Sequence, residues 1–146
     1  MKTIKTLTAV VAISLMSSLM PAEAKNINVS NRLIDAIMIV ESEKDRYAVG
    51  DGGKAIGMAQ IHKICVDDVN RIIGEKRYTY DDRKSPTKSR QMMRIYLSYY
   101  GTRYERLTKQ KATPEILAKI WNGGPNGWKK YATVAYAKKV LKRMFA

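Results

Sequence analysis

Ile37-Met38-Ile39-Val40-Glu41-Ser42 is an apolar segment that ends in a carboxylate. Apolar residues also stand three, four, seven and eight positions before Glu41, namely Met38, Ile37, Ile34 and Leu33. This spacing predicts a helix whose apolar face carries the carboxyl group. Partial desolvation there favours the neutral form and raises the pKa of Glu41, as a general acid near neutral pH requires. The alternative is that the helix ends here and Glu41 turns into solvent, because Glu is seldom buried without a partner.

A glycine-rich turn follows this helix at a short distance. Tyr47 to Met58 alternates short apolar pieces with the turn-forming run Gly50-Asp51-Gly52-Gly53. This pattern predicts a small β-hairpin that folds back beside Glu41. The hairpin runs directly into Gly57-Met58-Ala59-Gln60-Ile61.

A second glycine-rich corner lies late in the chain. Ile120-Trp121-Asn122-Gly123-Gly124-Pro125-Asn126-Gly127 is followed by Thr133, Tyr136 and Val140. Glycine allows positive φ angles and close approach of the backbone, so this corner can bring main-chain groups against a ligand. Taken alone, the corner is equally well a tight exit from a helix.

These blocks together resemble the lysozyme-like superfamily. Glu41-Ser42, the glycine-rich turn and Gly57 to Ile61 are similar to the Glu-Ser and Gly-Leu-Met-Gln-Ile signatures of lytic transglycosylases of the SLT type. The late block resembles the Asn-Gly-Gly-Pro segment and Thr-x-x-Tyr-x-x-x-Val tail of invertebrate-type lysozymes, and also the Tyr-Asn-Ala-Gly block of transglycosylases. The resemblance extends from about Leu33 to Val140, and three blocks in the same order are more specific than any one of them.

The resemblance implies a set of site residues. Glu41 becomes the catalytic acid, and Tyr136 is expected near it. Asp51 matches the second catalytic Asp of invertebrate-type lysozymes, which transglycosylases lack, so it is either a catalyst or a plain turn residue. His62 either lines the cleft or lies on the surface at the start of a helix. The expected substrate-binding residues are Ser42, Gly57, Met58, Gln60, His62, Asn122, Gly123 and Tyr136.

The chain departs from the related families at two points. Invertebrate-type lysozymes are rich in disulfides, whereas Cys65 is the only cysteine here, so no internal disulfide can form. Transglycosylases usually have Glu before the threonine of the late block, whereas this chain has Ala132. Any contact made by that Glu is missing.

Apolar spacing and cap residues predict the other helices. One helix carries Ile61, Cys65, Val69 and Ile72 on a single stripe and ends at Gly74, which makes Cys65 a buried small hydrophobe. Tyr78 to Asp82 is a polar connection. Ser85-Pro86 then provides an N-cap and a proline at the first helical position. The helix that follows, Thr87 to Leu107, turns Met92, Met93, Tyr96, Leu97, Tyr100, Tyr104 and Leu107 inward, as core rather than as a sugar-stacking stripe.

Two helices complete the chain. Thr113-Pro114 repeats the cap-and-proline start and opens a helix that stops at Asn122. The last helix runs from about Thr133 to Met144. About five helices with one small β-hairpin beside the cleft give a mainly α (α+β), lysozyme-like fold.

The N-terminus predicts export. Lys2 and Lys5 precede Leu7 to Met20, an uncharged, largely apolar run of 14 residues, and Pro21-Ala22-Glu23-Ala24 offers a cleavage site. A membrane anchor needs about 20 apolar residues. We therefore expect a signal peptide over residues 1–24, a domain over residues 25–146, and a periplasmic or secreted protein.

The charge and composition of the chain limit the classes of partner and cofactor that we expect. The chain has 27 Lys+Arg and 13 Asp+Glu, and without Lys2, Lys5 and Glu23 of the predicted signal peptide these become 25 and 12, a net charge of +13. For an exported protein this charge indicates an anionic cell-wall surface rather than nucleic acid. His62 is the only histidine and has no ligand-like spacing around it, so neither a metal nor another cofactor is expected. We expect a monomer without a stable membrane span.

The resemblance implies a peptidoglycan-cleaving enzyme. It would act on the β-1,4 bond between N-acetylmuramic acid and N-acetylglucosamine as a lytic transglycosylase, giving 1,6-anhydro products. The alternatives are a hydrolytic muramidase that uses Glu41 and Asp51, a non-catalytic wall-binding protein on the same scaffold, and a basic secreted module that binds membranes or nucleic acid.

Overall fold

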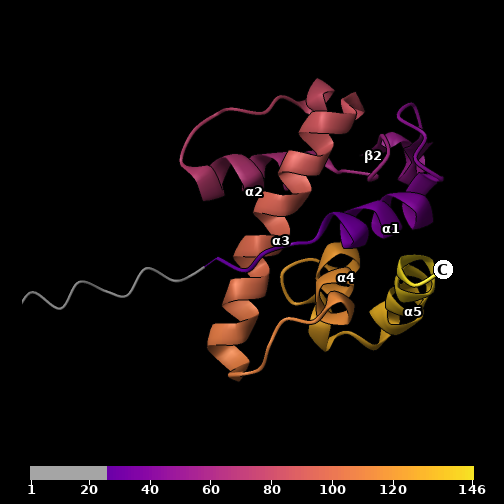
Figure 1. Cartoon of the computed structure of the whole chain (residues 1–146). Helices are drawn as coiled ribbons and strands as arrows, with labels where there is room; N and C mark the ends of the chain where they lie inside the picture. Colours follow the sequence, from indigo (N-terminus) through magenta and orange to yellow (C-terminus); the bar gives the residue numbers. More distant parts are fainter. Residues whose placement is uncertain (1–25) are drawn as a thin grey trace, which may run out of the picture.

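A computed structural model describes residues 26–146 and shows a mainly helical protein. The helices are α1 (Asn31–Ser42), α2 (Lys63–Ile73), α3 (Pro86–Thr108), α4 (Pro114–Gly123) and α5 (Val134–Met144). Strands β1 (Val49–Gly50) and β2 (Ala55–Ile56) form an antiparallel hairpin (Figure 1). The predicted fold of five helices and one small hairpin is confirmed. The predicted signal peptide lies outside the described residues and stays a prediction.

Helix α1 lies at the centre of the fold. The Ser30 side chain caps it by accepting a hydrogen bond from the backbone N–H of Leu33 at 3.2 Å. Its apolar face, which includes Ile34, Ile37 and Met38, is fully buried. This face packs against α5 and α3, so the last turn of α1 reaches the protein interior with Glu41 half-buried at its end.

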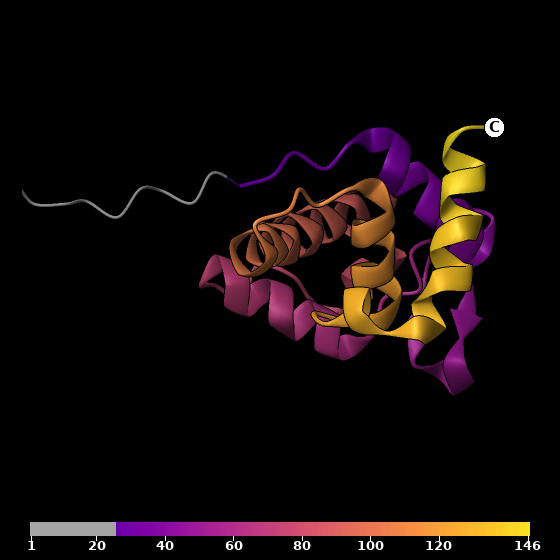
Figure 2. The same cartoon turned by 90° about the horizontal axis from the view of Figure 1, so that it is seen from below.

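The layers on either side of α1 give the molecule two lobes. Figure 1 shows α2 and the hairpin on one side of α1, and α4 with α5 on the other. Helix α3 runs past both and packs against α2 and α4, while Figure 2 shows α5 lying beside α1 and α4. None of the helices in residues 26–146 has the length and apolar character that crossing a bilayer requires.

Helix α2 places the predicted stripe toward the core, with Cys65 only partly covered. Val66 and Val69 are fully buried, whereas Cys65 is half-buried and only packs against the core. Ile61 is buried too, but it precedes the helix and forms a bridge with Ile56 of the hairpin. Cys65, Val69 and Ile72 thus face the core as predicted, and Val66 widens the buried face.

Helix α3 follows the prediction closely except at its end. Ser85 caps it and Pro86 occupies its first turn. The predicted inward residues from Met92 to Tyr104 are buried, but Leu107 is 55% exposed. Met92, Tyr96, Tyr100 and Tyr104 follow one another at four-residue steps, and the next step is Thr108. Leu107 therefore lies outside the buried face of the helix.

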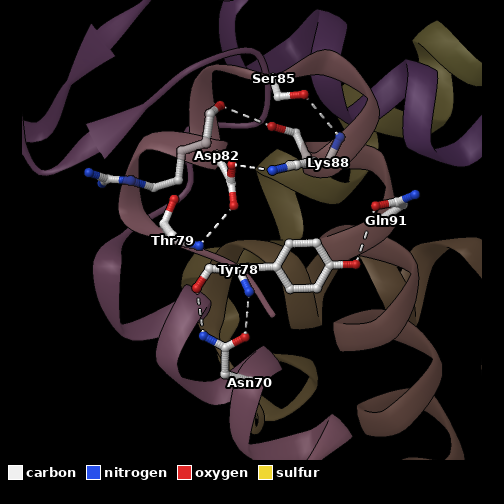
Figure 3. Close-up of polar contacts among 9 residues, drawn as sticks. Asn70, Tyr78, Thr79, Asp82, Ser85, Lys88 and Gln91 are labelled. Atoms are coloured by element: carbon white, nitrogen blue, oxygen red, sulfur yellow. Dashed lines mark hydrogen bonds and ion pairs between the residues drawn. The ribbon is translucent and has the colours of Figure 1, made fainter. Parts of the chain in front are cut away.

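The connection between α2 and α3 is more ordered than a polar linker. Figure 3 shows Asn70 bonded to both backbone polar groups of Tyr78, at 2.8 and 2.9 Å, while the Tyr78 ring is buried. Asp82 accepts hydrogen bonds from the Thr79 N–H at 2.8 Å and the Lys88 ammonium at 2.7 Å. These contacts fold Tyr80–Lys84 into a 3₁₀ turn that buries Arg83.

Candidate active site

Glu41 lies in the last turn of α1 and faces α5. The hydroxyl of Tyr136 donates a hydrogen bond to Oε1 of Glu41 at 2.6 Å. Burial is the largest influence on this carboxyl and raises the pKa of Glu41, while the Tyr136 hydroxyl and the Trp121 side chain act in the opposite direction. Burial beside Glu41 also raises the pKa of Tyr136, which therefore stays a donor. A half-buried carboxyl group with a raised pKa and one fixed donor can serve as a general acid.

A cavity of about 450 Å³ opens in front of Glu41. Residues of the hairpin, α2, α3 and α4 meet there, so segments far apart in the sequence share one surface. Five of the predicted site residues line it, namely Glu41, Asp51, Gln60, His62 and Asn122. The other lining residues are Ala55, Ile61, Ile64, Cys65, Tyr96, Trp121 and Gly124. A larger cavity of about 810 Å³ lies between α2 and the connection to α3, away from Glu41.

Asp51 shares this cavity but differs from Glu41 in its surroundings. It starts the 3₁₀ turn of the hairpin, Asp51–Gly53, with a φ of 47°. Its side chain is 60% exposed, and its Oδ2 lies 3.4 Å from Nε2 of His62. Asp51 is thus a solvated carboxylate that His62 can pair with when the imidazole is protonated.

Ser42 connects the end of α1 to the loop after the hairpin. Its hydroxyl donates to the carbonyl oxygen of Met58 at 2.9 Å. Neither Ser42 nor Met58 lines the cavity. The contact fixes the position of the segment that leads to Gln60, and direct binding of substrate by Ser42 and Met58 stays a prediction.

Gly57 and Gln60 shape the wall that the hairpin contributes. Gly57 has a φ of +79°, and a Cβ atom there would lie 2.0 Å from the carbonyl oxygen of Arg83, so only glycine fits. The Gln60 amide donates from Nε2 to the Gly57 carbonyl at 3.0 Å. The Oε1 atom of the Gln60 side chain lies against Gly50, where a Cβ atom on residue 50 would come within 2.2 Å of it. Gln60 is therefore held at the cavity wall.

The late glycine corner lies opposite the hairpin. Asn122 is exposed and lines the cavity. Gly123 lies behind it, where a Cβ would come within 2.6 Å of Cγ2 of Thr133, so α4 can end close to the start of α5. Gly57, Gly123 and Tyr136 are outside the cavity lining, and Tyr136 reaches the site through Glu41.

Some cavity residues carry no functional signal in the sequence. Trp121 and Tyr96 look like core residues by their spacing, and their rings do pack edge to face at 5.8 Å, yet both also line the cavity. Ile64 is 76% exposed at the cavity rim. Only the position of Trp121 directly before Asn122 could have suggested its place in the site.

Two carboxyl groups, those of Glu41 and Asp51, line the cavity. Within residues 26–146, no three or more His, Cys, Asp or Glu side chains lie close enough together to hold a metal ion. Burial raises the pKa of the Cys65 thiol to about 12, so Cys65 is not a thiolate nucleophile at neutral pH.

Comparison with protein families identifies a relationship that extends over most of the chain. The family model described as "Transglycosylase SLT domain" matches residues 18–142. No curated protein matches the chain.

Proposed function

The chain belongs to the transglycosylase SLT domain family of peptidoglycan-cleaving enzymes, and we propose that it cleaves the β-1,4 bond between N-acetylmuramic acid and N-acetylglucosamine with Glu41 as the general acid. The observation that carries this proposal is the half-buried Glu41 carboxyl, which faces a cavity of about 450 Å³ and accepts a 2.6 Å hydrogen bond from Tyr136. Its raised pKa supports the same role, because a general acid must be protonated near the working pH.

The proposed reaction needs only one catalytic carboxyl group. Glu41 gives its proton to the glycosidic oxygen as the bond to C1 of the muramic acid breaks, and the substrate acetamido group stabilises the oxocarbenium-like centre. The C6 hydroxyl of the same sugar then attacks C1, and the Glu41 carboxylate takes the hydroxyl proton. The product is a 1,6-anhydro ring, and Glu41 returns to its protonated form.

A hydrolytic muramidase is the second candidate, because Asp51 lines the same cavity as Glu41. A retaining hydrolase needs its second carboxylate fixed at about 5 Å from the acid. Asp51 is instead 60% exposed on a glycine-rich turn and lies 3.4 Å from His62. A solvent-exposed carboxylate paired with His62 is a poor nucleophile, which favours the transglycosylase.

Mass spectrometry of sacculi digested by the parent and by Asp51→Asn tests the proposal. We expect 1,6-anhydro muropeptides, each lighter than the hydrolysis product by one water, from both proteins at rates within about threefold. Asp81→Asn serves as the control, because Asp81 is exposed and lies outside the cavity lining. Hydrated products from the parent that disappear in Asp51→Asn would establish the hydrolase instead.

The site of action follows from the substrate. We propose that the protein is exported with removal of residues 1–24 and works as a monomer in the periplasm or outside the cell, against glycan strands and the anionic wall surface. The basic, apolar and small-residue order of residues 1–24 supports export.

A further inference from the structure

A second, smaller cavity adjoins the cavity in front of Glu41. It has a volume of about 340 Å³ and is lined by Gly53, Lys54, His62, Lys63, Ile64 and Arg83. His62 and Ile64 line both cavities, so the two cavities are neighbours. Its lining includes three basic residues, Lys54, Lys63 and Arg83, and no Asp or Glu. We call it the basic side pocket.

Arg83 is the buried cation of the basic side pocket. It is 8% exposed, and it donates from Nε to the Tyr80 carbonyl at 2.7 Å and from Nη1 to the carbonyls of Lys54 and Ile61 at 3.1 and 3.2 Å. In the part of the chain that the structure describes, these bonds leave Nη2 free. The carbonyls fix the guanidinium in place but do not neutralise its charge.

The two lysines of the pocket are also without an anionic partner. Among residues 26–146, neither Lys54, Lys63 nor Arg83 forms an ion pair with a carboxylate. Lys63 lies over the Tyr80 ring at 4.9 Å, and Asp67, one helical turn further on, accepts from the Tyr80 hydroxyl at 3.0 Å instead. The positive charge of the pocket is therefore available to a ligand.

We infer that the basic side pocket binds a carboxylate of the peptide branch that muramic acid carries, so that the enzyme prefers peptide-bearing glycan. This inference rests on the proposed function. The sugars of the glycan backbone are uncharged, and the anionic groups of the polymer lie on the peptides that leave the backbone sideways. A guanidinium with a free N–H edge, in a pocket that two lysines also line, suits a carboxylate.

Cleavage of two matched substrates tests the preference. Glycan strands with intact peptides are compared with strands whose peptides an amidase has removed, for the parent, for Lys54→Glu/Lys63→Glu, and for Lys109→Glu/Lys111→Glu. The last variant changes the net charge equally at two exposed lysines outside both cavity linings.

We expect the parent and the control to favour peptide-bearing strands in kcat/KM by about tenfold, the worth of a hydrogen bond to a charged group. In Lys54→Glu/Lys63→Glu the ratio should fall to within about twofold. A parent without preference, or a variant that slows on both substrates and keeps the parent's ratio, would overturn the inference while leaving the proposed function intact.

A binding experiment distinguishes a failure of the proposed function from a failure of the proposed pocket. A parent that cleaves neither substrate overturns the proposed function, and the pocket is then judged by NMR titration of the labelled protein with a soluble acidic stem peptide. Resonances of Lys54, Lys63 and Arg83 should shift in the parent, and the shifts should be lost in Lys54→Glu/Lys63→Glu and with a peptide whose carboxylates are amidated. Equal binding of the amidated peptide contradicts the pocket.

Discussion

At the scale of single residues, two opposing effects act on Glu41. Burial favours the neutral carboxyl, whereas the Tyr136 hydroxyl stabilises the carboxylate through a 2.6 Å hydrogen bond. Burial is the larger effect, so the pKa of Glu41 is raised. The proposed general acid is active only while it is protonated, so we expect the rate to fall as the pH rises through this pKa.

Tyr136→Phe should shift the alkaline limb of the pH–rate profile to higher pH. The change removes the donor that lowers the pKa of Glu41, so the carboxyl group stays protonated further into the alkaline range. We also expect about a tenfold loss of kcat, because the carboxyl group is no longer held by a hydrogen bond of about 1.5 kcal/mol.

The control for this prediction is Tyr131→Phe, which removes the same hydroxyl from a side chain that is 91% exposed. It should leave the pH–rate profile unchanged. A limb that moves to lower pH in Tyr136→Phe would mean that Tyr136 does not stabilise the Glu41 carboxylate.

At the scale of elements, the hairpin depends on contacts with distant segments. The Ser42 hydroxyl holds the Met58 carbonyl, and Gly57 packs against the carbonyl oxygen of Arg83. Ser89 on α3 donates to that same carbonyl at 2.9 Å. The wall that carries Asp51 and Gln60 is thereby joined to α1 and α3.

Gly57→Ala should destabilise the protein more than Gly74→Ala. Both glycines have a positive φ, 79° and 74°, so both substitutions cost about 1 kcal/mol of backbone strain. Only at Gly57 does the new Cβ meet a backbone oxygen, at 2.0 Å, whereas Gly74 faces open space. We expect a loss of about 3 kcal/mol for Gly57→Ala in urea unfolding. Equal losses in the two variants would show that Gly57 does not pack as described.

The sequence predicts elements well where the signal is local. Ser85 and Thr113, each followed by proline, cap α3 and α4 as expected, because a cap needs only the first turn of its own helix. Arg83 is different: its burial depends on carbonyls 29 and 22 residues away along the chain, so nothing near it in the sequence indicates it. Ile61 is buried as its apolar character predicts, but its bridge with Ile56 of the hairpin is a contact that the sequence did not indicate.

At the scale of the whole molecule, the site is assembled from segments that only the fold brings together. Glu41, Gln60 and Asn122 come from three separate blocks, and the order of these blocks indicated that they share one cleft. Ile64 and Tyr96 could not be found in this way, because an exposed apolar residue and a core tyrosine have the same local pattern in any helical protein.

The net charge of +13 on residues 25–146 should make binding to sacculi depend on salt. The screening length falls from about 30 Å at 0.01 M to about 8 Å at 0.15 M ionic strength, which weakens attraction to an anionic surface. We expect about a tenfold loss of affinity for Glu41→Gln protein in a sacculus pull-down over this range. A neutral oligosaccharide of N-acetylglucosamine is the control and should change by less than about twofold. An affinity for sacculi that does not change with ionic strength would mean that the protein binds the wall through sugar contacts alone.

The most direct test of Glu41 as the general acid is the rate at which Glu41→Gln clears a suspension of sacculi. Glutamine can still accept the hydrogen bond of Tyr136, so the fold and wall binding should be kept, while the rate should fall by at least about 100-fold. Glu43→Gln, two residues further on at an exposed position, should clear sacculi at the parent rate. A Glu41→Gln protein that clears sacculi nearly as fast as the parent would contradict the catalytic role of Glu41.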